Sequence, residues 1–327
     1  MARAALLLVL ALATFAGCGS ADDLAPRFFA ADSPWNKPLP DTAPLDPASA
    51  ALAAELERQL HAHGAWINSN EYSVPIYTVP KSQAGTSVHI DTPSDMFTGI
   101  PDATTLAQAL EGIPIPPGAR PAAGTDRHMV VWQPSTDTMW ELWIAYRVGD
   151  GFPVRDDTPG WHASWGAKIT GVSRSPGVVP SPFGATASGL PLVAGLITLE
   201  ELKDGRIDHA LALALPDAKA GAFVPPANRT DGTYSGPHAI PEGTRFRLPA
   251  DLDVQALGLP PVARMIAAAA QRYGIVVRDR AGSVAFYAED PTPTGNAVLR
   301  ERLAGQSPAE ALARFPWNRL QALAPAR

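Results

Sequence analysis

Ionisable side chains gather around one predicted β-hairpin in the middle of the chain. Asp126, Arg127 and His128 stand before its first strand, and Glu141 lies between Trp140 and Leu142 in its second strand. An imidazole beside a carboxylate can transfer protons near neutral pH, because the carboxylate orients the ring and stabilises its charged form. We therefore expect acid–base chemistry from Asp126, His128 and Glu141. The alternative is a surface pair of Asp126 and Arg127, with His128 merely ending a strand.

The strands of this hairpin are predicted at residues 129–133 and 138–148, separated by the turn-forming run Pro134-Ser135-Thr136-Asp137. A turn centred on Thr136 and Asp137 places Trp132 opposite Glu141. One face then carries His128, Val130, Trp132, Glu141 and Trp143. A shift of the register by one residue would send Glu141 to the other face, so the expected site depends on the turn.

A fourth catalytic candidate is His209, near the start of the alternating run Ile207-Asp208-His209-Ala210-Leu211. Its place on the apolar face is equally typical of a hydrogen-bonded core histidine. His128, Glu141 and His209 have the ligand types of a two-histidine, one-carboxylate metal site, but they lack a fixed spacing. We therefore predict no metal site and expect no cofactor.

Four residues are candidates for substrate binding. Arg127 can hold an anionic or hydroxyl-rich group in its planar fork, and Trp143 offers a stacking surface. Trp165 shares a strand face with Trp161, either as core or as a platform for sugar rings. Arg245 alternates with Phe246 and can flank an acidic sugar, although such an arginine is commonly just solvated.

Elements with clear boundaries surround the hairpin. Helices are predicted from the cap Asp46 to Gly64, at residues 102–111, from the capping box of Thr198 and Glu201 to Gly205, at 260–273 and at 307–314. Strands are predicted at 74–79, 86–90, 163–172, 192–198, 207–215, 244–248, 275–278 and 284–287. Arg264, Tyr273 and Asp279 are expected to fasten one helix to the next strand. The pattern predicts a mainly β fold with peripheral helices, an antiparallel β-sandwich or barrel-like single domain over residues 33–327.

The N-terminal segment is typical of a bacterial lipoprotein export signal. Arg3 precedes an apolar stretch over residues 4–15, and small residues lead to Cys18. This stretch is shorter than the about 20 residues that a spanning helix needs. We expect removal of residues 1–17, lipidation of Cys18 and a tether over residues 18–32. The predicted location is outside the cytoplasm, on the outer membrane of a Gram-negative host, with the Cys18 lipid as the sole membrane contact.

Composition excludes several classes of protein. The 327 residues include 26 basic and 32 acidic side chains, a formal net charge of −6. This balance does not indicate a basic surface for binding nucleic acid. Cys18 is the only cysteine, so neither an intramolecular disulfide nor a cysteine-based metal site can form. The nucleophile-elbow, Walker, dinucleotide-binding and His-Glu-x-x-His motifs are absent from the sequence.

Several separated blocks resemble a family of exported bacterial proteins. They run from Asp32-Ser33-Pro34-Trp35-Asn36 through Gly124-Thr125-Asp126-Arg127-His128, Trp140-Glu141-Leu142, Gly184-Ala185-Thr186-Ala187-Ser188-Gly189-Leu190-Pro191 and Ile207-Asp208-His209-Ala210-Leu211 to Arg245-Phe246-Arg247-Leu248 and Arg272-Tyr273-Gly274. The resemblance covers most of the mature sequence and implies export. It brings no activity, fold or ligand with it.

Two functions fit these observations best, and a metal-dependent hydrolase is a third, weaker alternative. The first is a lipid-anchored carbohydrate-active enzyme that cleaves a polysaccharide by hydrolysis or elimination, using the four catalytic candidates. The second is a non-catalytic lipoprotein that binds glycan or envelope material on a tryptophan surface. A cleft with His128 and Glu141 within hydrogen-bond reach favours the enzyme. Burial of these two residues apart from each other, beside an aromatic strip, favours the binding protein.

Overall fold

The computed structural model describes residues 28–91, 103–153, 156–180 and 183–325. The predicted leader, Cys18 and the first part of the predicted tether lie outside these residues. Ordered contacts begin before the predicted start at Ser33, since Phe29 is 5% exposed and the Ala30 amide donates to the Ser175 carbonyl at 2.9 Å. Within the described ranges, no helix is both long and apolar enough to cross a membrane.

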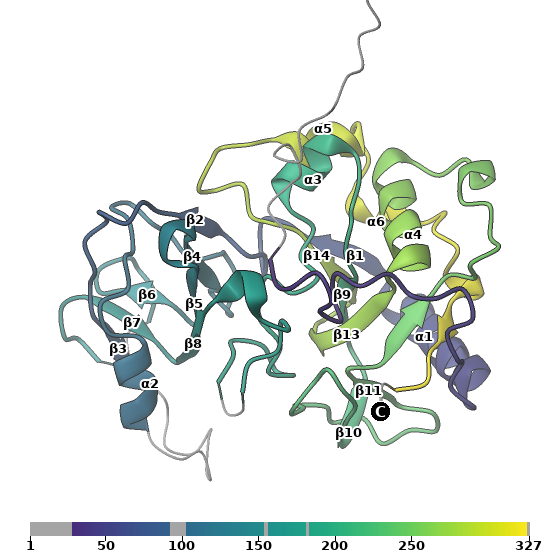
Figure 1. Ribbon diagram of the computed structural model, residues 1–327, viewed down its shortest axis with the longest axis horizontal. Helices are drawn as coiled ribbons and strands as arrows, with labels where there is room; N and C mark the ends of the chain where they lie inside the picture. The colour runs from purple at the N-terminus through teal and green to yellow at the C-terminus, as the bar shows by residue number, and fades with distance from the viewer. Residues whose placement is uncertain (1–27, 92–102, 154–155, 181–182, 326–327) are drawn as a thin grey trace, which may run out of the picture.

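The predicted fold class is confirmed: the described residues form fifteen strands and six α-helices, with the helices at the periphery (Figure 1). The strands make four open sheets, none of which closes into a barrel. Parallel pairs are interspersed among the expected antiparallel ones, for example between the strands at Ala65–Asn68 and Val284–Tyr287. Two larger sheets define the architecture.

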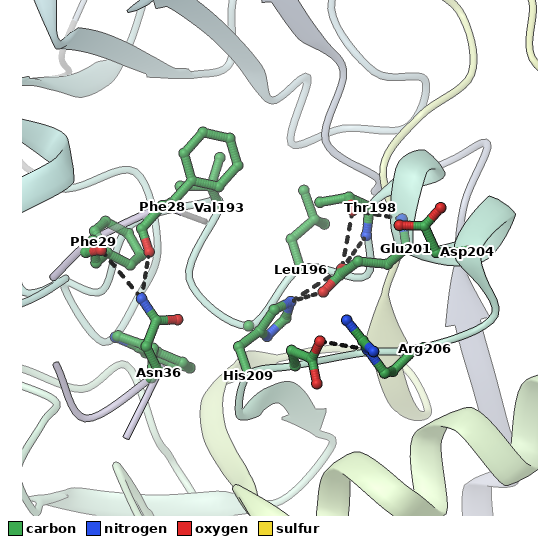
Figure 2. A pocket seen from close by; sticks show the side chains of 13 residues that line it. Phe28, Phe29, Asn36, Val193, Leu196, Thr198, Glu201, Asp204, Arg206 and His209 are labelled. Atoms are coloured by element: carbon green, nitrogen blue, oxygen red, sulfur yellow. Dashed lines mark hydrogen bonds and ion pairs between the residues drawn. The ribbon is translucent and has the colours of Figure 1, made fainter. Parts of the chain in front are cut away.

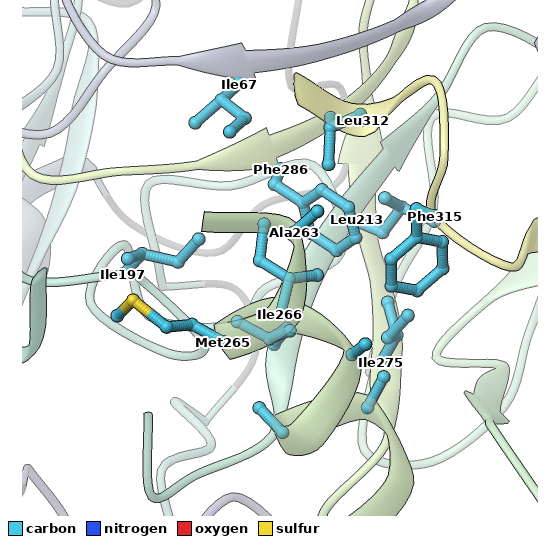
Figure 3. Packing of buried hydrophobic residues seen from close by; sticks show 14 of the residues in the cluster. Ile67, Ile197, Leu213, Ala263, Met265, Ile266, Ile275, Phe286, Leu312 and Phe315 are labelled. Carbon is cyan, nitrogen blue, oxygen red and sulfur yellow. The ribbon is translucent and has the colours of Figure 1, made fainter. Parts of the chain in front are cut away.

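The six-stranded sheet has the order β1-β14-β9-β13-β12-β15. These strands are β1 (Ala65–Asn68), β14 (Val284–Tyr287), β9 (Leu211–Leu215), β13 (Ile275–Arg280), β12 (Arg245–Arg247) and β15 (Gln321–Ala322). Alternation along β9 gives the sheet two apolar faces, because Leu211, Leu213 and Leu215 belong to one core cluster and Ala212 and Ala214 to another. The leucine face packs against the helices (Figure 3).

Five helices lie around the six-stranded sheet. They are α1 (Ser49–His63), α3 (Leu199–Asp204), α4 (Pro261–Arg272), α5 (Val298–Leu303) and α6 (Pro308–Leu312). In Figure 1, α3 and α5 lie above the strands of this sheet, and α1, α4 and α6 lie to the right of them. The capping boxes of α3 and α6 are present, with Thr198 and Glu201 at one and Ser307 and Glu310 at the other. Helix α1 begins later than predicted, because Asp46 forms a turn in which it accepts from the Ala48 amide at 2.7 Å.

The second large sheet has the order β2-β4-β5-β8 and carries the predicted hairpin. Its strands are β2 (Ile76–Thr78), β4 (Met129–Gln133), β5 (Thr138–Trp143) and β8 (Trp165–Thr170). One face packs toward the alanine face of β9. The other packs near α2 (Ala103–Ala109) and the small sheet of β3 (Val88–Ile90), β7 (Trp161–Ala163) and β6 (Tyr146–Arg147). A two-stranded sheet joins β10 (Ala218–Phe223) and β11 (Ile240–Glu242).

The hairpin register differs from the prediction by two residues. Gln133 pairs with Thr138 and Glu141 pairs with Val130, because the turn spans four residues and ends at Asp137 in the left-handed conformation (φ 48°). The Asp137 carboxylate also accepts from the Ser173 amide at 2.9 Å, which secures this turn. An even shift keeps each side chain on its face. Glu141 and His128 therefore lie on the predicted common face.

The predicted strand over residues 192–198 is instead a loop packed directly on the six-stranded sheet. The Ala194 amide donates to the Pro191 carbonyl at 3.0 Å, and Gly195 has φ 72°. A Cβ at Gly195 would lie 2.3 Å from the Ala212 nitrogen. Glycine thus permits both the turn and the close approach to β9. This loop covers the face of the hairpin that carries Glu141.

Candidate functional site

The common face of the hairpin is interior, not the open pocket that we expected. Glu141 is 0% exposed, and its carboxylate accepts hydrogen bonds from the amides of Ala185 at 2.8 Å and Leu192 at 2.7 Å. Burial raises the pKa of Glu141, and these two amides offset part of the rise. The Glu141 side chain is therefore committed to holding the loop that covers it.

His128 lies in the same interior and is 3% exposed. Burial, together with the positive charge of Arg278, lowers the pKa of His128 to about 3, although a hydrogen bond to the Ser73 backbone opposes this. Arg278 is itself fully buried and donates to the carbonyls of Leu192 at 2.6 Å and Ala194 at 2.9 Å. His128 is therefore neutral at physiological pH and is sealed from substrate, which removes it from the acid–base site that we predicted.

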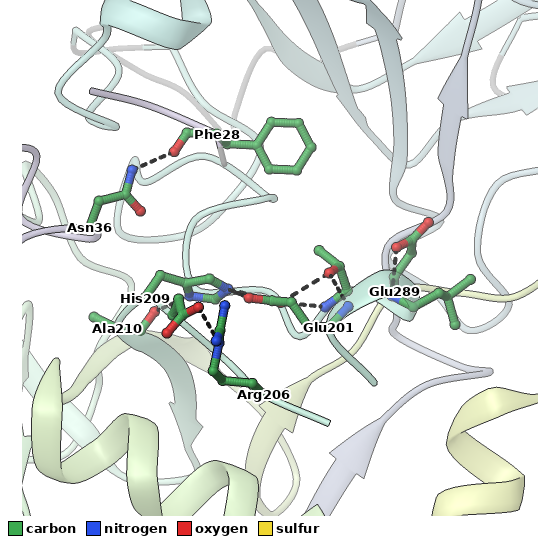
Figure 4. Close-up of polar contacts among 10 residues, drawn as sticks. Phe28, Asn36, Glu201, Arg206, His209, Ala210 and Glu289 are labelled. Atoms are coloured by element: carbon green, nitrogen blue, oxygen red, sulfur yellow. Dashed lines mark hydrogen bonds and ion pairs between the residues drawn. The ribbon is translucent and has the colours of Figure 1, made fainter. Parts of the chain in front are cut away.

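His209 forms a structural ion pair with the capping residue of α3 (Figure 4). Its Nε2 lies 3.0 Å from Glu201 Oε1, and its Nδ1 lies 2.8 Å from the Ala210 carbonyl. Burial alone would lower the pKa of His209, but the charge of Glu201 and the hydrogen bond to it outweigh burial and raise the pKa. Both ring nitrogens face acceptors, so both are best satisfied as donors in the charged ring.

The cavity beside His209 does not suit a polymer. Figure 2 shows it between Phe28, Asn36, Leu196 and His209, where the Asn36 side chain donates to the Phe28 carbonyl at 2.8 Å. Its volume of about 30 Å³ holds only one or two water molecules. The prediction that His209 supplies catalytic acid has no support in this geometry.

Three predicted substrate-binding residues instead hold the fold together. Arg127 donates to the Ala145 carbonyl at 2.8 Å and pairs with Asp150 at 2.5 Å. Arg245 donates to the Pro34 carbonyl at 2.5 Å, and burial lowers the pKa of Arg245 to about 10. Trp165 is only 3% exposed. We therefore remove these three side chains from the expected ligand surface.

Asp126 and Trp143 remain together and lie at the edge of the interior. Asp126 lines a groove of about 740 Å³, a volume within the range of about 300–1,000 Å³ that is typical of ligand sites. Burial raises the pKa of Asp126, and a hydrogen bond from the Trp143 side chain opposes the rise. The indole N–H can only donate, so it stabilises the charged form of this carboxyl group.

Two exposed aromatic side chains flank this groove. Trp66, on the edge strand β1, is 41% exposed, and Tyr72, in the segment after β1, is 36% exposed. Gly124 has φ 92°, and a Cβ there would lie 2.9 Å from the Tyr72 ring. The glycine of the Gly124-Thr125-Asp126 block thus lets the Tyr72 ring lie against the backbone that leads to Asp126.

A second hollow shares lining residues with this groove. Trp66, Ser69 and Asn70 line both hollows, and the second has a volume of about 480 Å³. A still larger hollow of about 1,210 Å³, on which Arg245 lies, is lined largely by proline and aliphatic side chains. The pair of hollows at Trp66 combines aromatic surface, amide groups and a carboxyl group. We take this pair, which we call the Trp66 groove, as the candidate site.

The sequence analysis missed Trp66, Tyr72 and a nearby group of carboxylates. A signal was present in Ala65-Trp66-Ile67-Asn68, where Ile67 is buried and Trp66 must therefore face outward in a strand. The polar run up to Tyr72 then mixes amides with an aromatic ring. Asp279, which we expected in a network with Arg264 and Tyr273, instead lies with Asp231 and Glu242.

Comparison with protein-family models, with curated proteins and with solved structures finds no match to this chain.

Proposed function

We propose that this protein binds glycan chains outside the cytoplasm through the Trp66 groove, tethered by a lipid on Cys18. The observation that carries the proposal is that Trp66 and Tyr72 both line one groove and are both exposed. Sugar rings present apolar faces that stack on aromatic side chains, and hydroxyl groups that bond to amides and carboxylates. Asn70 and Asp126 also line this groove.

The length of the groove favours a polymer over a single sugar. Two hollows of about 740 and 480 Å³ meet at Trp66. An oligosaccharide can occupy both, with one ring on the indole and its neighbours beside Tyr72 and in the second hollow. A lipid-tethered protein needs just such a surface to hold an envelope or extracellular polysaccharide near the cell.

The test measures retention of the full chain, purified in detergent, on a panel of soluble and insoluble polysaccharides that includes cell-wall material. Trp66→Ala is expected to weaken binding by about 5- to 30-fold, since stacked aromatic anchors contribute on the order of 1–2 kcal/mol. Phe223→Ala is the matched control, because Phe223 is similarly exposed (46%) and lies on β10, outside the groove. No retention on any glycan, or equal loss in both variants, would overturn the proposal.

Cleavage of the bound glycan is the second candidate, and the position of Asp126 favours it. A carboxyl group that lines the groove and is oriented by Trp143 is placed to exchange a proton with a glycosidic oxygen. Hydrolysis needs a second carboxyl group, and Glu71 also lines the groove. Asp126→Asn should then abolish new reducing ends or unsaturated products while binding persists. Binding without products in the wild type would leave recognition as the function.

A further inference from the structure

Three carboxyl groups converge beside the six-stranded sheet, outside the Trp66 groove. Asp231 comes from the segment after β10, Glu242 ends β11, and Asp279 lies near the end of β13. One oxygen from each lies within 4.8 Å of the others. Three oxygens within this limit can all reach one calcium ion, which binds oxygen at about 2.3–2.6 Å. Acidic groups on a surface commonly lie close together without a bound ion. Burial distinguishes this cluster from such groups.

Glu242 is the decisive member of this carboxylate cluster. It is 0% exposed, and neither of its carboxylate oxygens has a hydrogen-bond partner of normal geometry. The Thr230 hydroxyl and the Asp231 backbone lie near enough to influence its pKa without satisfying it. A buried carboxylate is costly unless it is paired or coordinates a cation. Its two oxygens are therefore available to a ligand that accepts electron pairs.

The neighbouring arginines do not fill this role. Arg229 donates to the carbonyls of Gly184 at 2.6 Å and Thr186 at 2.7 Å, and Arg278 donates to the carbonyl of Leu192 at 2.6 Å. Arg280 approaches only the outer member of the cluster, at 3.8 Å from Asp231. Asp126, which lies close enough to raise the pKa of Asp279, adds a further negative charge. Arg278 keeps two unpaired nitrogens, Nε and Nη2, and its charge opposes the rise in the pKa of Asp279, but among the described residues no cation forms an ion pair with Glu242 or Asp279.

We propose that Asp231, Glu242 and Asp279 bind one calcium ion. All the side-chain donors are oxygens, which selects hard cations over the transition metals that prefer imidazole or thiolate. Calcium tolerates irregular geometry and completes its shell with water, whereas magnesium demands a near-ideal octahedron. Asp231 is exposed and gives the ion a route in from solvent. The alternative occupant is a proton: burial, with the nearby charge of Asp279, raises the pKa of Glu242 to about 8.

The test titrates calcium chloride into the full chain, purified in detergent and treated with a chelator, by calorimetry and thermal unfolding. We expect one ion per chain, with a Kd near the about 10⁻⁴–10⁻³ M of extracellular calcium modules, and a rise in Tm. Glu242→Gln should weaken binding at least about tenfold, because a neutral amide replaces a ligand of full charge. Glu111→Gln makes the same chemical change at an exposed position on another part of the fold and should bind like wild type.

Asp231→Asn is the second variant, because this exposed residue can change without disturbing the interior; its calcium affinity should also fall. Absence of binding heat and of any Tm shift at about 10 mM calcium would overturn the proposal. The cluster would then hold protons on its carboxyl groups in place of a metal ion. Unchanged affinity in Asp231→Asn and in folded Glu242→Gln would overturn it as well. Magnesium titrated in parallel should bind more weakly. None of these readouts involves glycan, so they are independent of the proposed function.

Discussion

The interior between the two large sheets and the Trp66 groove hold similar kinds of side chain in opposite states. In the interior, Glu141 is 0% exposed and its carboxylate accepts from two loop amides, whereas His128 is 3% exposed and its Nδ1 lacks a hydrogen-bond partner. In the groove, the carboxylate-bearing Glu71 is exposed, and Trp66 is 41% exposed, whereas Trp165 in the hydrophobic core is 3% exposed. Residue type therefore does not distinguish a structural polar group from a functional one. Access to solvent does.

The largest expected effect tests the interior. Glu141→Ala should lower the free energy of unfolding by about 3 kcal/mol or more, because it leaves the amides of Ala185 and Leu192 buried without an acceptor. Glu71→Ala, in the groove, should change it by no more than about 0.5 kcal/mol. Urea denaturation followed by circular dichroism measures both. Equal effects would erase the distinction between the two regions.

The next effect concerns the buried ion pair of His209 and Glu201. The pKa of His209 is raised above 6.5, so its stabilisation is complete below pH 6.5 and is lost as pH rises through the folded-state pKa. Burial alone would raise the pKa of Glu201, but the charge of His209 and the hydrogen bonds from His209 and Thr198 lower this pKa below 4.5. The stabilisation from Glu201 is therefore present above pH 4.5 and is lost as pH falls.

His209→Gln should therefore cost about 1–2 kcal/mol of stability, most visibly between pH 4.5 and 6.5, with the deficit shrinking at alkaline pH. Thermal unfolding of both proteins across this pH range provides the measurement. A deficit that grows as the pH rises would contradict the assignment of a charged ring. Glycan binding at constant pH should be unaffected, since His209 does not line the groove.

Apart from the Glu71 control, the smallest effect is expected at Arg127. Its partner Asp150 is about a quarter exposed, and such surface pairs contribute less than about 1 kcal/mol. Asp150→Ala should therefore shift stability by less than that amount and leave glycan retention intact, as followed by the same denaturation and retention assays. Loss of retention in this variant would return Arg127 to the list of ligand-binding residues.

Local patterns in the sequence predicted the elements well where a cap or an alternation defined them. The capping boxes at Thr198 and Ser307 set the starts of α3 and α6, and the face shared by His128 and Glu141 survived a register error of two residues. The strand predicted at 192–198 failed because its apolar composition comes from burial of a loop, whereas Gly195 supplies a turn. Apolar composition alone does not distinguish a buried loop from a strand.

The candidate site was harder to predict because it depends on which surface stays uncovered. Nothing local to Glu141 shows that residues 185 and 192 will donate to it from about 50 positions away. The carboxylates of Asp231, Glu242 and Asp279 likewise come from three separate segments. Alternation along Ala65-Trp66-Ile67-Asn68 puts Trp66 on the face opposite to Ile67, but its exposure depends on what covers that face, since Asn68 on the same face is buried.

The most direct test of the Trp66 groove is to follow the indole N–H signals of the eight tryptophans by NMR during titration with the best-retained oligosaccharide. We expect the Trp66 signal to move most. The Trp143 signal should move less, because Trp143 interacts with Asp126, which lines the groove. Trp35, which is 1% exposed and donates to the Gly177 carbonyl at 2.8 Å, should not move. A stationary Trp66 signal at saturating ligand would contradict the account.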